Sequence, residues 1–324
     1  MTAAEPLPRG VPPLYGPVQA RRNRGLYGLY AVVLAFLVID AVLFPGLLSR
    51  DGFARLTQNW FPLALAGMAQ ALVMLAGGIS LSLGAMVSLG AVIAAVTMSG
   101  PAGVGGGLAL VLAAGLAIGA ATGLIVVRLR LPAIVVTLAA SFLIGGTALL
   151  ILPRPGGAIP DGFSDLLAGD QPIAFGILVV IVGLWKLYLA TPLGLSLYAA
   201  GENPVAAHNA GIAVDRVRIA AYALSGLLST AAGLFVAAQT GSGDPVIGDS
   251  FTLNSIAAAV LGGVGFLGGS GTMRGALAGS LLLSLMINVM FFLGLPPVAQ
   301  YVAQGLIIIA AVALPQLRIR GRRS

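Results

Sequence analysis

The chain has 324 residues, of which 58% are hydrophobic and only 8% are charged. A soluble domain carries about 25% charged residues, so this composition excludes a water-soluble globule and predicts a membrane protein. The net charge of +7 does not indicate nucleic-acid binding, because the basic residues stand in short clusters between apolar runs. With no cysteine, the chain has no disulfide framework and no thiolate metal site.

Residues 1–26 are rich in proline and include a basic run of arginines at 21–24. They lack the short apolar core and the small-residue cleavage pattern of a signal peptide, so we expect a cytoplasmic tail. A second basic tail, residues 316–324, ends the chain. Between the two tails, residues 27–315 form a single expected transmembrane domain.

Ten apolar runs divide this domain and predict an all-α, polytopic membrane protein with about ten transmembrane helices of roughly 20 residues each. The runs lie at 27–48, 60–77, 80–98, 104–127, 131–152, 172–190, 217–240, 251–268, 275–294 and 296–315. The 46 glycines predict closely packed helices, because small residues let membrane helices approach each other and the bilayer disfavours any non-helical backbone.

The basic residues predict the orientation of these spans. If the N-terminus lies inside, ten spans place 14 of the 17 basic residues on the cytoplasmic side and leave only Arg50, Arg55 and Arg154 outside. Most of the acidic residues fall on the outer side. We therefore expect a multi-pass protein of a bacterial inner membrane with both termini in the cytoplasm.

Two glycine pairs interrupt apolar segments in the two halves of the chain. Gly77-Gly78 lies within LAGGISLSLGAM, and Gly262-Gly263 lies within VLGGVGFLGGSG. Glycine-broken helices at matching positions are typical of transporters with two repeated halves, and they point to the transport pathway. Two pseudo-repeated halves and coincidence in a glycine-rich chain explain this pattern equally well.

Several kinds of catalytic chemistry are excluded by counting. Lys186 is the only lysine, so there is no Gly-Lys-Ser/Thr phosphate loop, and His208 is the only histidine, so there is no paired-histidine zinc site. A Gly-x-Gly-x-x-Gly string at 263–268 follows an apolar run, and no acid after Asp249 is available to bind a ribose. We expect a protein that is not an enzyme and needs no cofactor of its own.

Ion-coupled transport would need ionisable side chains at membrane depth. Asp40 in the first span is the only acid well inside a predicted helix. The favoured interpretation is an acid that faces water or a polar neighbour near the outer end of that span. An ion-coupled secondary transporter or a channel is therefore the alternative, and the main prediction is a transporter that draws its energy from a partner.

The long loop at 188–216 carries the clearest polar feature. Asn203-Pro204 is a helix-start signal, because Asn caps a helix and Pro fits its first position, and Gly211 is a helix-stop signal. The sequence therefore predicts a short helix at 204–210. This helix is either a docking site for a soluble partner or an ordinary interfacial turn, and periodicity alone favours the turn.

Five strings stand out in chain order. They are Gly77-Gly78-Ile79-Ser80-Leu81-Ser82-Leu83-Gly84, Thr191-Pro192-Leu193-Gly194, Ala200 to Ile212, Leu253 to Gly263 and Gln304 to Val312. Together they resemble the ribose-type and branched-chain-amino-acid-type permeases of ATP-binding-cassette (ABC) importers. The string at 200–212 resembles the coupling loop of that family. The residues of this string and of the string at 77–84 are closer to those of the monosaccharide branch than to those of the amino-acid branch.

The resemblance implies the ABC importer permease fold and a permease subunit for a sugar, expected to be a monosaccharide; a branched-chain amino acid or a nucleoside is the alternative. It also implies cytoplasmic ATPase subunits that use the ATP, a second permease subunit in a homodimer or heterodimer, and a periplasmic substrate-binding protein. The coupling loop would span about 191–216. Its ATPase-coupling residues would be Gly201, Glu202, Asn203, Pro204, Ala206, Ala207, Gly211 and Ile212.

Neutral polar and small residues near the glycine pairs are candidates for the translocation pathway, because a neutral sugar needs hydrogen-bonding groups rather than fixed charges. They are Gln70, Gly77, Gly78, Ser80, Ser82, Asn254, Ser255, Gly262 and Gly263. Each polar one serves equally well to hold neighbouring helices together. Ser80 stands where the family has an acid, which implies either a heterodimer whose partner keeps the acid or, slightly favoured, a serine that bonds a backbone carbonyl.

Overall fold

The structure, a computed structural model, describes residues 16–169, 173–294, 296, 302 and 305–306. Within them the chain is helical and has no strand, only an isolated bridge between Gly156 and Gly243. The elements are α1 (Gly16–Leu43), the 3-10 helix η1 (Pro45–Leu48), α2 (Arg50–Leu75), α3 (Leu83–Thr97), α4 (Gly103–Arg128), α5 (Ala133–Ile151), α6 (Asp161–Ala168), α7 (Ile173–Leu189), α8 (Pro192–Glu202), α9 (Pro204–Asn209), α10 (Val214–Thr240), α11 (Asp249–Leu261) and α12 (Met273–Phe292). The all-α prediction is confirmed for these residues.

Five described helices are long and apolar enough to cross a membrane, namely α4, α5, α7, α10 and α12. Shorter apolar helices lie at Tyr27–Leu43, within α1, and at α3. On α5, Phe142 and Leu150 are 74% and 85% exposed, as expected of side chains that face lipid. The last predicted span, 296–315, lies almost entirely outside the described residues.

Four helices match their predicted spans closely. The bounds of α4, α5, α7 and α12 lie within two residues of 104–127, 131–152, 172–190 and 275–294. The predicted span at 251–268 is wrong in its second half, because α11 ends at Leu261 and a loop follows. Several glycines of that loop have positive φ, which a right-handed helix does not contain.

Other differences come from polar or short helices. α6 and α8 lie in segments predicted as loops, and α1 begins at Gly16, inside the expected tail. α2 begins at Arg50, well before the predicted span at 60, because Ser49 caps it by accepting a 3.1 Å hydrogen bond from the Gly52 nitrogen. The first turns of α2 are polar, so the apolar run at 60–77 does not include them.

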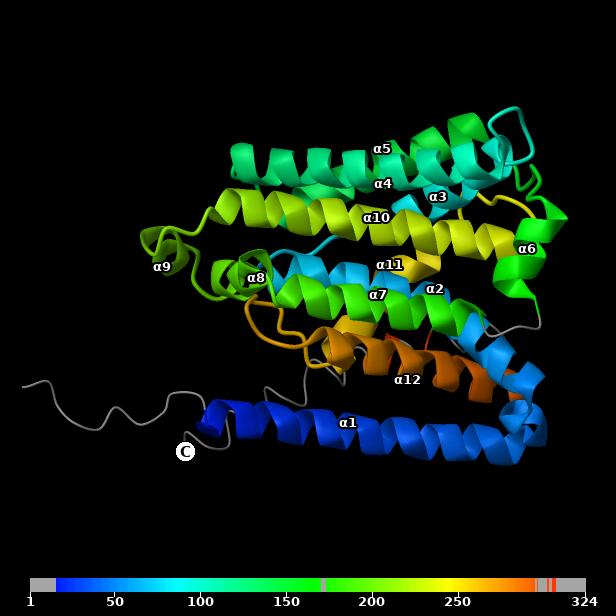
Figure 1. The fold of residues 1–324 in the computed structure, drawn as a ribbon, viewed down its shortest axis with the longest axis horizontal. Coiled ribbons are helices and arrows are strands. Elements are labelled where there is room, and N and C mark those ends of the chain that lie inside the picture. The colour runs from blue at the N-terminus through cyan, green and yellow to red at the C-terminus, as the bar shows by residue number, and fades with distance from the viewer. Residues whose placement is uncertain (1–15, 170–172, 295, 297–301, 303–304, 307–324) are drawn as a thin grey trace, which may run out of the picture.

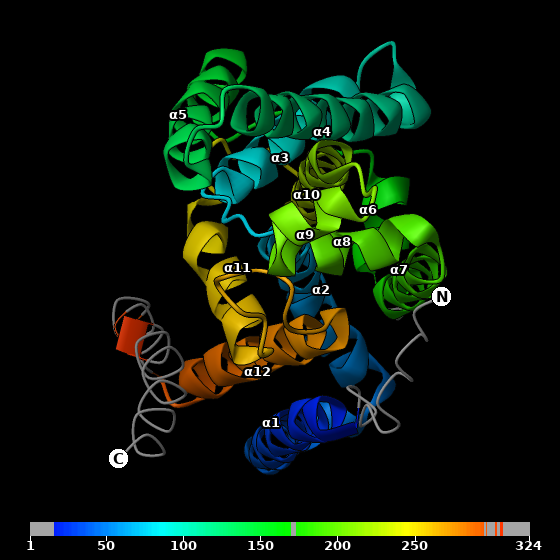
Figure 2. The ribbon, with the colours of Figure 1, turned by 90° about the vertical axis from the view of Figure 1, so that its left-hand side faces the viewer.

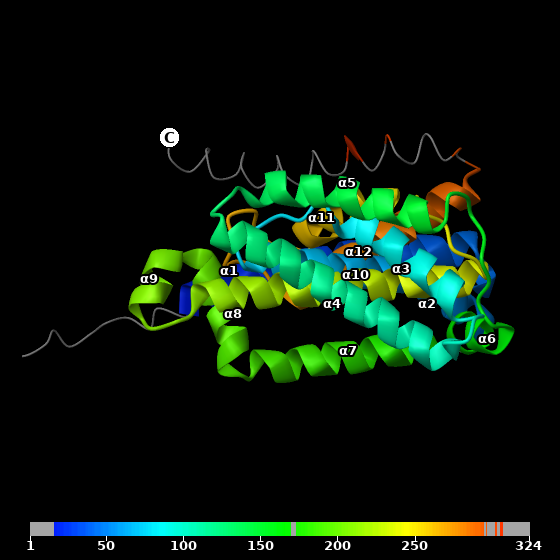
Figure 3. The same ribbon diagram turned by 90° about the horizontal axis from the view of Figure 1, so that it is seen from above.

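The helices run roughly along the longest axis of the molecule (Figure 1). Seen from one end, α2 and α10 occupy the middle, α4 and α5 lie on one side, and α12 and then α1 lie on the other (Figure 2). α8 and α9 stand at one end of the bundle and α6 stands at the opposite end (Figures 1 and 3). We call these the α9 end and the α6 end.

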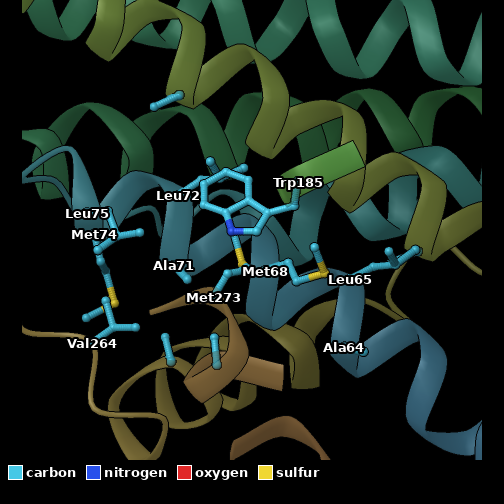
Figure 4. Close-up of a cluster of buried hydrophobic side chains, with 14 of the residues drawn as sticks. Ala64, Leu65, Met68, Ala71, Leu72, Met74, Leu75, Trp185, Val264 and Met273 are labelled. Carbon is cyan, nitrogen blue, oxygen red and sulfur yellow. The ribbon is translucent and has the colours of Figure 1, made fainter. Parts of the chain in front are cut away.

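α2 is the core helix of the bundle. Every residue from Phe61 to Leu75 is buried. Trp185 of α7 packs in the same cluster as Leu72 and Met68 (Figure 4), and the rings of Phe61 and Phe235 lie 4.4 Å apart. A helix that is buried all round belongs in the interior of a bundle, so the other helices are arranged around α2.

Glycines let α4 and α10 approach closely. Gly115, Gly119 and Gly123 recur every fourth residue on α4, and a Cβ atom at any of them would collide with α10 around Tyr222 and Gly226. Small residues at this spacing are typical of tightly packed membrane helices. The prediction that the glycines serve close packing is confirmed at this contact.

Candidate coupling and translocation site

The predicted short helix in the long loop is confirmed as α9, Pro204–Asn209. Asn203 caps it, because its Oδ1 accepts a 3.0 Å hydrogen bond from the Ala206 nitrogen. Gly211 ends it with a φ of +84°. The Asn-Pro start signal and the glycine stop signal therefore act as the sequence indicated.

α8 precedes α9 directly and was missed. Thr191 caps α8 by accepting a 3.4 Å hydrogen bond from the Gly194 nitrogen, and Pro192 takes the first helical position. This repeats the signal that revealed α9, but the apolar run of α7 continues almost up to it. The expected coupling loop is thus two consecutive helices that share Asn203 as the end of one and the cap of the next.

The candidate coupling residues divide by exposure. Glu202, Asn203, Ala206 and Gly211 are exposed, Pro204 and Ile212 are half-buried, and Gly201 and Ala207 are buried. Val205, which the sequence analysis did not single out, is 70% exposed and gives α9 an apolar tip. The exposed members form a surface at the α9 end, and the buried pair fixes α8 and α9 to the bundle.

Gly201 joins α8 to two segments that the sequence assigned to the pathway. A Cβ atom at Gly201 would overlap the carbonyl oxygen of Leu75, where α2 ends, and would lie 2.6 Å from the Gly269 nitrogen. That nitrogen donates a 3.1 Å hydrogen bond to the same Leu75 oxygen. A Cβ atom at Gly268 would lie 2.7 Å from the Cα of Gly77. We call these five residues the glycine junction.

Arg218 of α10 ties the glycine junction to the rest of the bundle. Its Nε donates a 3.2 Å hydrogen bond to the carbonyl oxygen of Ala76, directly after α2. A cation is favourable at the C-terminus of a helix, where unpaired carbonyl groups gather. From the sequence, Arg218 is expected only to mark the cytoplasmic side, because nothing near it along the chain points to α2.

The two glycine pairs that suggested a repeat end two helices in the same way. The hydrogen bonds run from Gly77 N to Met74 O and Gly78 N to Val73 O after α2, and from Gly263 N to Val260 O and Val264 N to Ala259 O after α11, at 2.8–2.9 Å. Gly77 and Gly263 both have positive φ, so each helix ends in a Schellman motif. Helix termination accounts for the matching glycines without a repeat.

Further from the α9 end, two short helices begin against each other. α3 follows the non-helical residues 76–82, which we call the connector, and α11 follows residues 241–248. The Gly248 nitrogen donates a 2.9 Å hydrogen bond to the Ser88 Oγ of α3. With 15 and 13 residues, the helices measure roughly 22 and 20 Å, less than the 30 Å or so of membrane hydrocarbon.

Ser80 and Ser82 are buried on the connector, and their Oγ atoms lie 3.1 Å apart. Within the described residues, Ser80 thus bonds a neighbouring hydroxyl and not the backbone carbonyl that was slightly favoured from the sequence. Thr137 of α5, which was not predicted, holds the connector in place. Its Oγ1 accepts a 3.0 Å hydrogen bond from the Leu81 nitrogen and donates one of 2.8 Å to Ala133 O.

Gln70 of α2 is fully buried, and neither of its amide atoms has a partner among the described residues. Val73 lies one turn further along the same face of α2. Its side chain would lie 3.2 Å from a Cβ atom at Gly78 of the connector. A buried amide without a partner costs about 1–3 kcal/mol, so apolar packing does not explain Gln70. Ser255 of α11 is also buried, but it bonds Thr252 O within its own helix at 3.0 Å.

Asn254 lines a cleft of about 620 Å³ between α2, α11 and α12, toward the α6 end. Amide, hydroxyl and guanidinium groups of Arg55, Asn59, Ser250, Ser284 and Asn288 share its wall with Phe44, Phe251, Phe291 and Phe292. The pathway candidates therefore fall into three places: Gly77, Gly78, Gly262 and Gly263 near the α9 end, Gln70, Ser80, Ser82 and Ser255 in the interior, and Asn254 in this cleft.

Asp40 is on α1, on the side that packs against α12. It is fully buried, and its Oδ2 accepts a 2.8 Å hydrogen bond from Asn288 Nδ2. Its Oδ1 has no partner among the described residues. Asp40 therefore has the polar neighbour that the sequence analysis expected, but it does not face water, and it lies well away from the glycine junction.

The chain matches the family described as "Branched-chain amino acid transport system / permease component" over residues 53–312. It therefore belongs to this family of ABC importer permeases, as the five strings indicated. It is a multi-pass subunit of a transporter in a bacterial inner membrane and not an enzyme. Members of the family work with ATPase and substrate-binding partners.

Two relatives are similar over most of the chain. The autoinducer 2 import system permease protein LsrC of Enterobacter sp. (strain 638) is 34% identical over 302 residues, which are 90% of this chain and 87% of that protein. The ribose import permease protein RbsC of Escherichia coli (strain K12) is 31% identical over 291 residues, which are 86% of this chain and 90% of that protein. No solved structure matches the chain.

Proposed function

We propose that this chain is the permease subunit through which an ABC importer takes up a sugar of about monosaccharide size. A periplasmic binding protein delivers the sugar, and cytoplasmic ATPase subunits supply the energy. The relative named for ribose import supports this substrate class. The permease itself contributes no chemistry, only contacts that differ between its outward-open and inward-open states.

In this proposal the chain has ten spans in two pseudo-repeated halves, with both termini and the α9 end in the cytoplasm. Arginines at the α9 end support this orientation, since Arg128 ends α4 and Arg216 and Arg218 begin α10. The short helices α3 and α11, which begin against each other, support two related halves. A second permease subunit, identical or related, completes the pathway.

The glycine junction is the observation that carries the proposal. The exposed residues around Glu202 and Val205 dock on the ATPase, and α8 transmits the movement. Because Gly201 has no side chain that could yield, a displacement of α8 passes directly to Leu75 and to Gly269. The connector passes it on to the buried serines and to the start of α3.

A branched-chain amino acid is the second candidate substrate, and the printed description of the family supports it. The relative named for ribose import favours the sugar, and the pathway candidates, all of them uncharged, offer the hydrogen bonds that a neutral sugar needs. The two candidate substrates are distinguished by measuring the uptake of labelled ribose in the presence of excess unlabelled ribose or leucine. We expect ribose to compete and leucine not to.

The substitution Gly201→Ala tests the junction. The added methyl group has no room between Leu75 and Gly269, whereas Gly176→Ala on α7 adds the same group in open space. In vesicles that contain the ATPase and the binding protein, we expect Gly201→Ala to lower uptake per ATP hydrolysed by roughly 5- to 150-fold, the usual range of a coupling free energy. Gly176→Ala should transport as the unmodified protein does.

Docking is tested separately by copurification of the ATPase. Glu202→Arg and Val205→Asp should weaken ATPase binding, because both side chains are exposed at the α9 end, while Gly201→Ala should leave it intact. Normal uptake by a folded Gly201→Ala protein would contradict the role of the junction. Normal ATPase binding and uptake in both docking variants would show that the ATPase binds elsewhere.

A further inference from the structure

A second cleft, of about 400 Å³, opens beside the glycine junction at the α9 end. It lies among the turn between α4 and α5, the first turns of α10 and the connector. Its polar walls are Arg130, Asp215, Arg218 and Tyr222, and its apolar walls include Val126, Val127, Leu131 and Ala133. The coupling mechanism involves one wall of this cleft, Gly77 and Gly78 of the connector, but assigns no ligand to the space itself.

Arg130 holds a backbone conformation that favours glycine. Its φ is +53°, and it is the only non-glycine residue with positive φ in the described part of the chain. Five other helices end at or just before a glycine with positive φ, namely Gly77, Gly211, Gly241, Gly263 and Gly294. A chain with 46 glycines thus places an arginine at the end of α4, across the cleft from Gly77, which also has positive φ. A strained residue of this kind indicates a role for its side chain.

Two further side chains of the cleft, Arg218 and Tyr222, have donor groups that bond no described residue. Arg218 has only its Nε engaged, by Ala76 O, and neither Arg130 nor Arg218 forms an ion pair with a described acid, although Asp215 lines the same wall. Tyr222 is 4% exposed, and its hydroxyl has no partner among the described residues. Two guanidinium groups and a hydroxyl group thus line one space, and the single carboxylate of that lining, Asp215, is paired with neither arginine.

The position of the cleft relative to the membrane restricts the class of ligand that can bind there. It lies at the C-terminus of α4 and the N-terminus of α5, two helices long enough to cross a membrane, and therefore at the depth of lipid headgroups. Arginines match the geometry of phosphate oxygens. Val126 on α4 and Ala133 on α5 continue the apolar wall along these two helices, toward the depth of the acyl chains.

We propose that this cleft binds the phosphate of an anionic phospholipid. Arg130 and Arg218 contact phosphate oxygens, the Tyr222 hydroxyl donates to a third oxygen, and the apolar rim contacts the first part of the acyl chains. Basic pockets between transmembrane helices are known to hold such headgroups. Free phosphate would meet the same polar groups but would leave the apolar rim unused.

The test uses the full chain in neutral detergent and measures retained lipid by native mass spectrometry. Phosphatidylglycerol and phosphatidylcholine with the same acyl chains are titrated separately. The variants are Arg130→Gly and Arg130→Gln, and the matched control is Arg154→Gln, which removes an exposed arginine at the α6 end. Glycine accepts the backbone of residue 130 without strain, so folding is preserved.

We expect phosphatidylglycerol to bind in preference to phosphatidylcholine. Either Arg130 variant should lower its affinity roughly fivefold, the effect of one basic residue near an anionic lipid, and Arg154→Gln should not. Equal binding of the two lipids, or an equal loss in the Arg154 control, would overturn the proposal. Displacement of the lipid by inorganic phosphate at comparable concentration would identify a free-phosphate site instead.

Discussion

The contact between α4 and α10 and the glycine junction both depend on glycine, but for different reasons. Gly115, Gly119 and Gly123 belong to a regular helix and let two helices meet along their length. Gly77 and Gly268 have positive φ and lie after a helix end and in a loop. The first set provides space for packing, and the second provides backbone conformations that other residues rarely adopt.

The difference teaches where the bundle is rigid and where it moves. Helices in lipid gain little hydrophobic energy by associating, so close packing of small residues carries the α4–α10 contact. The glycine junction joins helix ends and a loop through backbone groups, among them the 3.1 Å bond from Gly269 N to Leu75 O, and such segments open most easily. We expect changes at α4–α10 to reduce stability and changes at the junction to reduce transport.

The largest loss of stability should follow Gly119→Leu. A side chain there would collide with the backbone of α10 at Tyr222 and Ala223, and overpacking of a tight contact costs about 3 kcal/mol. Gly105→Leu is the matched control, because it adds the same side chain on α4 in open space. Thermal unfolding of the purified protein in detergent measures both. If both variants unfold at the same temperature, packing at Gly119 does not stabilise the bundle.

A smaller loss should follow Thr137→Val, which keeps the shape of the side chain and removes its hydroxyl. The Leu81 nitrogen then loses its 3.0 Å acceptor, at a cost of about 1 kcal/mol for an unpaired, partly buried donor. Thr147→Val is the control, because its hydroxyl bonds only Leu143 O of the same helix. Uptake should fall further in Thr137→Val than in a variant of equal stability elsewhere, since the connector is loosened. Equal uptake by Thr137→Val and by that variant of equal stability would show that the bond to the connector does not affect transport.

Much of the helical fold could be predicted from the sequence. α4, α5 and α7 are long apolar runs bounded by polar turns, so composition alone places them. α9 was found because capping chemistry is local, with Asn203 and Gly211 at its two ends. The predicted span at 251–268 is longer than α11, because apolar glycine-rich loops and apolar helices have the same hydropathy.

The glycine junction could not be predicted. Gly201 and Gly269 meet at the carbonyl oxygen of Leu75, and a backbone oxygen has no sequence signature. The support that Thr137 and Arg218 give to the connector depends in the same way on backbone partners more than 50 residues away. The glycine pairs were noticed, but a helix-ending motif and a repeat leave the same letters in the sequence.

The smallest effect should follow Asp40→Asn, on the helix that lies outside both glycine contacts. α1 packs mainly on α12, and Asn288 can donate to the replaced side chain as it does to Asp40, at 2.8 Å. We expect unchanged uptake in vesicles with the ATPase and no response to an ionophore that collapses ion gradients. In an ion-coupled transporter this buried acid would be the group that binds the ion. Loss of uptake in Asp40→Asn, together with uptake that follows an ion gradient without any ATPase, would therefore contradict the ABC importer mechanism itself and not only the minor role of α1.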